Sequence, residues 1–319
     1  MLPLLAFLVA TSAECIIMAL IPTLNLFTAI AWGATLIIAG LYLSRSHLII
    51  VFLANLAVLY LVLGFNSTMV FMLFFGFAGL IMSYLTNLGK DYYYMQNSGV
   101  IIAILGISIF LIFFYYGTEQ VGLANRQAEL NAYMKEAIVN FEQSDLYDSY
   151  EEQGLIMEDI ESSFNEMVTI IFKHLPALFY LQAIMVVFLM LFLAQLVSQT
   201  LPIERLRKKA FTKEIMPWQL VWVFIAGLGL WIWGREQTSA IYYVGSNILA
   251  VIAPIALYYG LAVALYLLSR TQMKKNIWLI ILTIIFILVF TVPVIIMVGL
   301  IGIFDALIDY RKIRLQKEV

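Results

Sequence analysis

The chain has 319 residues, of which 63% are hydrophobic and 12% are charged, with a formal net charge of -2. Soluble domains are about half apolar and about a quarter charged, so this composition excludes an ordinary soluble globular protein. In lipid, backbone amides must be satisfied within each segment, so apolar runs of about 20 residues predict membrane-spanning helices. The single cysteine, Cys15, excludes a disulfide framework and a cysteine-based zinc site.

Five apolar runs open the chain, and we expect each of them to form one membrane helix. The joints between them are short and carry turn residues, such as Pro22 and Gly64. Residues 1–116 are therefore predicted to form a first group of five membrane helices. The runs cover residues 2–21, 24–43, 48–64, 67–85 and 99–116.

A polar and strongly acidic insert follows at residues 117–172, where Arg126 and Lys135 are the only basic residues. Its apolar residues keep helical spacing, which predicts two amphipathic helices that form an external hairpin. The second of these helices is expected to continue into the sixth membrane helix. Four clustered acids lack the spacing and central glycine of a calcium loop, so they indicate a solvated helix face or a docking surface for a partner. They are Asp145, Asp148, Glu151 and Glu152.

The remaining apolar runs form a second membrane group over residues 173–310, with a basic tail at 311–319. Pro254 is expected to kink its helix or to free a backbone carbonyl. The final run has 31 residues, which is long for one crossing and short for two. The runs cover residues 175–197, 218–233, 245–268 and 277–307.

Charge placement favours two crossings in the final run. The loop at residues 202–217 is rich in Lys and Arg, which predicts a cytoplasmic position by the positive-inside rule. With ten helices and both termini in the cytoplasm, only Arg126, Lys135, Lys173 and Arg235 fall outside. The sequence therefore predicts an all-α polytopic transmembrane helix bundle with about ten helices, nine being the alternative.

Known catalytic patterns are missing from the sequence. There is no phosphate-binding loop, no metal-spaced histidine pair and no nucleophile elbow. His47 and His174 are expected near opposite faces of the membrane, so they do not share a metal. We expect a protein that is not an enzyme, with no cofactor, no metal site and no nucleic-acid partner. Any pumping requires a partner or an ion gradient.

Polar side chains inside apolar runs are the candidate ligand-binding residues. A carboxylate at membrane depth costs a few kcal/mol, so Glu14 is expected to face a cavity or a partner. It either handles a ligand or a proton, forms a hydrogen bond between helices in its protonated form, or lies at the interface. Gln182 and Asn247 complete the candidate pocket, although amides, including Asn55 and Gln195, commonly bridge helices.

Two acids near the end of the last helix are candidate partner contacts. Asp305 and Asp309 are four residues apart and share a helix face beside Arg311 and Arg314. They indicate either a salt-bridged anchor or a surface that engages a membrane or cytosolic protein.

Four short segments, in this order, give a resemblance to a known family. They are Leu175-Pro176-Ala177-Leu178, Met216-Pro217-Trp218, Gly245-Ser246-Asn247-Ile248-Leu249 and Phe304-Asp305-Ala306-Leu307-Ile308-Asp309-Tyr310-Arg311. Together they resemble the YybS-like family of bacterial multi-pass membrane proteins of unknown function. That family is distantly similar to the substrate-capture components of energy-coupling factor transporters, which have fewer helices.

The resemblance implies a location in the bacterial plasma membrane, the cytoplasmic membrane. In the transporter components, an alanine-rich first helix packs on the coupling subunit, a part that Ala6 and Ala10 could take here. Our leading hypothesis is a transporter-like protein that binds or helps to move a small solute in a pocket with Glu14, Gln182 and Asn247. The alternative is a scaffold that recruits partners through the external hairpin and the basic inner loop.

Overall fold

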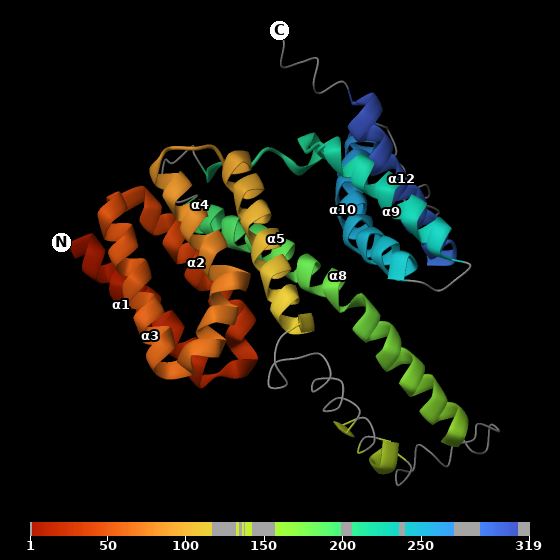
Figure 1. Cartoon of the computed structure of the whole chain (residues 1–319). Coiled ribbons are helices and arrows are strands. Elements are labelled where there is room, and N and C mark those ends of the chain that lie inside the picture. Colours follow the sequence, from red (N-terminus) through yellow and green to blue (C-terminus); the bar gives the residue numbers. More distant parts are fainter. Residues whose placement is uncertain are drawn as a thin grey trace. The chain divides into compact units, whose positions relative to one another are not determined.

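The computed structural model describes residues 2–116, 132–133, 136, 138–141, 157–198, 206–235, 240–270 and 288–311, and these residues are essentially helical. Seven of the described helical segments are long and apolar enough to cross a membrane, so the predicted all-α polytopic architecture is confirmed. The chain divides into two compact units, Met1–Lys208 and Lys209–Val319 (Figure 1). This division keeps the sixth membrane helix with the first five, whereas the sequence suggested a boundary at the acidic insert.

The first two helices form an antiparallel pair. Helix α1 spans Leu2–Leu20, a 3-10 turn η1 spans Pro22–Leu24, and α2 spans Asn25–Tyr42. Pro22 ends the first helix because it has no N–H to donate and it fixes φ at the start of a turn. Phe7 near the start of α1 stacks on Tyr42 at the end of α2, with ring centroids 6.0 Å apart.

A reversal at Gly64 divides the next helical segment into two crossings. Helix α3 spans Arg45–Phe71 and consists of two helices joined at a kink, where Gly64 has φ 77° and ψ 177°. That conformation favours glycine and breaks the helix. Farther on, Ser83 of α4 (Phe77–Asn87) donates to the carbonyl of Leu36, and Asn87 to that of Leu43. The chain therefore returns along α2 after Gly64, as its turn chemistry predicted.

A short π-helix, η2 (Met72–Gly76), joins α3 to α4. Its wider turn lies where Phe71 meets Trp32 of α2 edge to face, with ring centroids 5.1 Å apart. Such single π-helical turns are frequent near functional sites. Here the turn adjoins the polar residues described below.

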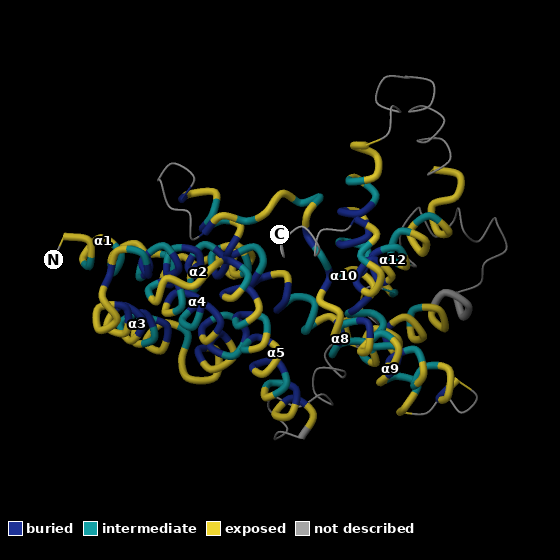
Figure 2. Tube along the Cα trace, turned by 90° about the horizontal axis from the view of Figure 1, so that it is seen from above, coloured by how far each residue is buried: buried dark blue, intermediate teal, exposed yellow. Residues whose placement is uncertain are grey.

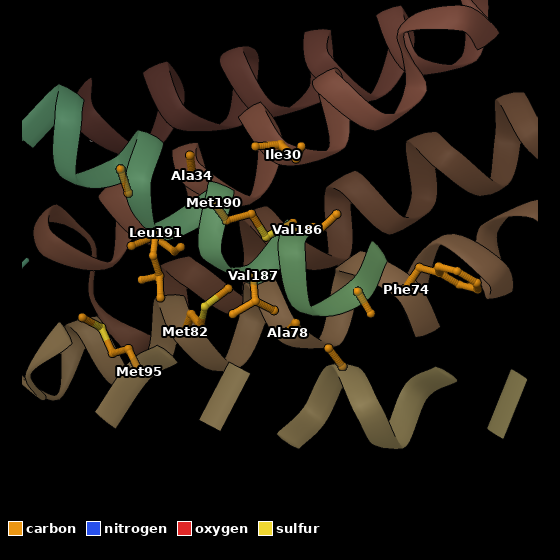
Figure 3. Packing of buried hydrophobic residues seen from close by; sticks show 14 of the residues in the cluster. Ile30, Ala34, Phe74, Ala78, Met82, Met95, Val186, Val187, Met190 and Leu191 are labelled. Carbon is orange, nitrogen blue, oxygen red and sulfur yellow. The ribbon is translucent and has the colours of Figure 1, made fainter. Parts of the chain in front are cut away.

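The core of the first unit forms around α8 (Met157–Ser198). Figure 3 shows Val186, Val187 and Met190 of α8 between Ile30 and Ala34 of α2 and Ala78 and Met82 of α4. Helix α5 (Tyr92–Tyr116) packs on α4 and α8. Each of these helices has buried and exposed faces (Figure 2), as expected for helices between a protein core and lipid.

Helix α8 has 42 residues, which is about 63 Å at the helical rise and about twice the thickness of a bilayer core. Its first half is largely exposed, with Met167, Ile170 and Ile171 among the exposed apolar residues. The continuous helix confirms that the second half of the acidic insert runs into the sixth membrane helix. Most of the first half of the insert, including Asp145 and Asp148, lies outside the described residues.

The second unit contains α9 (Gln219–Gly234), α10 (Ala240–Arg270) and α12 (Thr291–Ile308), preceded by a 3-10 turn η4 (Phe211–Lys213). Glycines allow close backbone approach here. A Cβ on Gly245 would meet the backbone of Trp231, and a Cβ on Gly302 would meet the carbonyl of Ala256. Helix α10 continues through Pro254 without ending.

Helices α10 and α12 run in the same direction. Tyr266, near the end of α10, has its hydroxyl 3.5 Å from the carbonyl oxygen of Arg311, just after α12. The two helix ends therefore lie at one end of this unit, and the start of α12 lies at the other. The intervening residues 271–287 lie outside the described residues.

Candidate functional site

Polar side chains from three helices meet near the middle of α1, α2 and the first half of α3. We call this set the α1–α3 polar site. Helix α1 packs on both α2 and α3, so the residues of one of its faces are placed between them. The site consists of Thr11, Ser12, Glu14, Trp32, Thr35 and Asn55.

Asn55 of α3 is fully buried and lies beside two hydroxyls of α1. The hydroxyl oxygens of Thr11 and Ser12 are 3.1 and 3.3 Å from its Oδ1. Its Nδ2 has no hydrogen-bond partner among the described residues. Turning the amide by 180° would leave Oδ1 unpartnered instead, so in either orientation one polar atom of Asn55 remains unsatisfied.

Glu14 is half-buried and faces α2. Thr35 Oγ1 lies 2.9 Å from Oε1 of Glu14 and 3.0 Å from the carbonyl oxygen of Ala31, which are alternative acceptors for the one hydroxyl proton. Oε2 of Glu14 is buried and has no hydrogen-bond partner in the described part of the chain. One oxygen of this carboxyl therefore lies in a hydrogen bond between helices, while the other, which we call the open oxygen, is buried without a hydrogen-bond partner.

Trp32 lies one turn before Thr35 on α2, and its side chain is 1% exposed. Its ring contacts Phe52 at a centroid distance of 6.2 Å, and Phe52 lies one turn before Asn55 on α3. The indole Nε1 has no hydrogen-bond partner, although buried tryptophans usually find one.

The α1–α3 polar site therefore presents three polar side chains with unsatisfied atoms near the middle of their apolar helices. An unpaired buried polar group costs about 1–3 kcal/mol, and each such group in a native structure calls for an explanation. A small polar molecule with hydrogen-bonding groups could satisfy all three side chains. The described residues contain no group of three or more His, Cys, Asp or Glu side chains that could hold a metal ion.

Gln182 and Asn247 lie on α8 and α10, outside the three helices that form the α1–α3 polar site. Gln182 is half-buried on α8, a helix that packs on α2, α4 and α5. Met190 of α8 lies against Gly33, two residues before Thr35, and side chains two positions apart point to different faces of a helix. Asn247 belongs to the second unit, where its amide donates to the carbonyl of Tyr243 at 2.7 Å.

Ala6 and Ala10 lie on an exposed face of α1, one turn apart. The face of α1 with Glu14 and Cys15 packs against α2 and α3. The two alanines are therefore open to lipid or to another protein.

Asp305 and Arg311 form a buried ion pair at the end of α12. Arg311 Nη2 lies 2.7 Å from Oδ2 of Asp305, and the two residues are 3% and 1% exposed. Arg311 also donates to the backbone carbonyls of Thr212 and Glu214, which precede α9. Of the two interpretations of the acids near the end of α12, this geometry agrees with the salt-bridged anchor. The Asp305 carboxylate is buried against Arg311 rather than exposed to a partner protein.

Asp309 follows the end of α12 in a left-handed conformation, with φ 50° and ψ 57°. Its N–H donates to the carbonyl of Asp305 at 2.9 Å, so it caps the helix. Aspartate is among the few residues that adopt this conformation readily. Asp309 is half-buried and remains the more accessible of the two acids.

Sequence reasoning identified Glu14 and treated Asn55 as a bridge between helices, but it missed Thr11, Ser12, Trp32 and Thr35. Threonines in membrane helices usually donate to their own backbone, as Thr68 does to Gly64, so they give little signal. The spacing of Thr11 and Glu14 on one face of α1 is the signal that was available.

Neither curated proteins nor solved structures gave a significant match. Residues 9–306, nearly the whole chain, match the family described as "Predicted membrane protein (DUF2232)". This agrees with the resemblance to a family of multi-pass membrane proteins, whereas the distant similarity to energy-coupling factor components stays a prediction. The long apolar helices and this match together show an integral membrane protein, and the chain belongs to the DUF2232 family.

Proposed function

We propose that this protein binds a small polar solute inside the membrane, at the α1–α3 polar site, and helps to transport it without an ATPase of its own. The observation that carries the proposal is the set of unsatisfied polar atoms on Glu14, Trp32 and Asn55. Polar residues at membrane depth that face a bundle interior commonly mark a substrate path. Transport proteins often bind their substrates near the midplane of the membrane. Glu14, Trp32 and Asn55 each lie near the middle of an apolar helical stretch.

The polar site is a better candidate than a pocket that includes Gln182 and Asn247. Its members are linked by hydrogen bonds between α1 and α2 and between α1 and α3. It is also partly accessible, because Glu14 is only half-buried.

The test is purification from native membrane followed by mass spectrometry of bound small molecules. Wild type, Glu14→Gln and Asn55→Leu are compared. Ser108→Ala is a matched control, because Ser108 is also a membrane polar residue that bridges helices, with its hydroxyl 2.9 Å from the Tyr180 hydroxyl. A small molecule should accompany wild type and the control but be lost or depleted in both site variants.

Equal retention by all four proteins would contradict binding at this site. Co-purification of proteins without any small molecule would favour the scaffold function instead. In that case the contacts should involve the exposed half of α8 or the basic loop with Arg207, Lys209 and Lys213.

We also propose that the protein lies in the bacterial cytoplasmic membrane with both termini in the cytoplasm. The distribution of basic residues supports this orientation.

A further inference from the structure

The α1–α3 polar site contains an acid that has no basic neighbour among the residues that the structure describes. Residues 1–89 include only Arg45 and His47 as basic residues, and both are exposed at the start of α3. Arg45 lies over the ring of Tyr84, 5.7 Å from its centroid, and His47 Nδ1 lies 3.0 Å from the Ser44 hydroxyl. Neither supplies a counter-charge to Glu14, which is near the middle of α1.

The open oxygen of Glu14 has no hydrogen-bond donor among the described residues. Oε1 lies beside the Thr35 hydroxyl, whereas Oε2 is buried and unpartnered. An ionised carboxylate in this position also lacks charge balance, which is costly away from water. A donor with a positive charge satisfies both needs at once.

The other members of the α1–α3 polar site are available to the rest of the solute. Trp32 lies one turn before Thr35 on α2, and its ring packs on Phe52 and Phe71. The unpartnered indole N–H of Trp32 and the unsatisfied amide atom of Asn55 remain for a polar group elsewhere on the solute.

Resting on the proposed function, we infer that the solute bound at the α1–α3 polar site carries a protonated primary or secondary amine that donates to Oε2 of Glu14. A neutral alcohol or amide could also donate to this oxygen. It would, however, bind a glutamine at position 14 as well as a glutamate, because the amide oxygen still accepts. An amine loses its counter-charge in that variant.

The experiment uses the pool of small molecules released by heat from wild-type protein purified from native membrane. The pool is separated on cation-exchange and anion-exchange resins, and each fraction is added to detergent-purified wild type, Glu14→Gln and Ser108→Ala. The melting temperature reports binding, since a ligand of the native state stabilises by mass action. A portion of the active fraction is treated with acetic anhydride, which converts primary and secondary amines to neutral amides.

The stabilising compound should be retained by the cation exchanger and should lose its effect after acetylation. Glu14→Gln should bind it about ten- to a hundred-fold more weakly, the usual loss for a hydrogen bond to a charged group, and Ser108→Ala should respond like wild type. Activity in the anion-exchange fraction or the flow-through, survival after acetylation, or an unchanged response of Glu14→Gln would each overturn the amine assignment. If no fraction stabilises wild type, the proposed function fails together with it.

Discussion

At the scale of single residues, the protein contains two contrasting kinds of buried polar group. Arg311 is surrounded by acceptors, namely the Asp305 carboxylate and the carbonyls of Thr212 and Glu214. Glu14 has one polar neighbour and one open oxygen. A nearly satisfied buried ion pair holds elements in place, whereas an incompletely satisfied group is available to a ligand.

The hydrogen bond between Thr35 and Glu14 can be measured with a double-mutant cycle. Using Glu14→Leu and Thr35→Val, we expect a coupling free energy of about 0.6 kcal/mol, the average for polar pairs between membrane helices. The measurement is the free energy of unfolding of the four proteins in detergent. A coupling of zero would show that the Thr35 hydroxyl bonds only to Ala31.

Removing one partner of the buried ion pair should be strongly destabilising. Arg311→Met leaves Asp305 buried without a counter-charge, so we expect a loss of about 3–5 kcal/mol in the free energy of unfolding. The double variant Asp305→Leu/Arg311→Met should lose less, because no isolated charge remains. Lys213→Met, in the same region but exposed, is the control and should change stability by less than about 0.5 kcal/mol. A double variant less stable than Arg311→Met would contradict this account.

At the scale of elements, helices in both units approach closely through glycines, since Gly40 and Gly106 of the first unit and Gly302 of the second each face the backbone of another helical segment. Membrane helices lack a strong hydrophobic drive to associate, so small residues that allow close packing matter in their interfaces. Gly302 of α12 faces α10, while Gly299 on the same helix has open space around it.

This difference predicts opposite outcomes for two alanine substitutions three residues apart. In Gly302→Ala the new methyl group would lie 2.6 Å from the backbone nitrogen and 3.0 Å from Cα of Gly260, so the helices must separate. We expect a loss of about 1–3 kcal/mol. Gly299→Ala meets nothing within 4 Å and should be neutral or slightly stabilising, because alanine loses less entropy in a helix. Thermal unfolding of both variants tests the prediction, and equal melting temperatures would refute the close approach.

At the scale of the whole molecule, the main question is how the helices cross the membrane. In the first unit the chain reverses at Pro22 and Gly64, so Arg45–Asn87 contributes two crossings rather than one. In the second unit α10 and α12 run in the same direction.

Reporter fusions test this topology directly. Fusions after Ala124, Glu152 and Gln237 should read outside, and fusions after Lys209, Lys274 and Val319 should read inside. The fusion at Val319 is decisive between the two counts. An external reading there would favour nine crossings.

The sequence by itself determined the membrane environment, the helical class and most helix positions. These follow from local properties, because hydropathy over about 20 residues and turn residues such as Pro22 and Gly64 act within a short stretch of chain. The same local information identified Glu14 as an unusual residue. Local information could not identify Thr35 as the neighbour of Glu14, since a polar residue in an apolar run does not reveal which helix its side chain will face.

Only the tertiary structure decided which polar residues act together. It paired Glu14 with Thr35 and the α1 hydroxyls with Asn55, and it placed Gln182 and Asn247 elsewhere. It also showed that Arg311, which the sequence assigned to a basic tail, is buried against the segment before α9. These contacts join residues up to about a hundred positions apart, and the packing of whole helices, rather than any local pattern, sets such pairings.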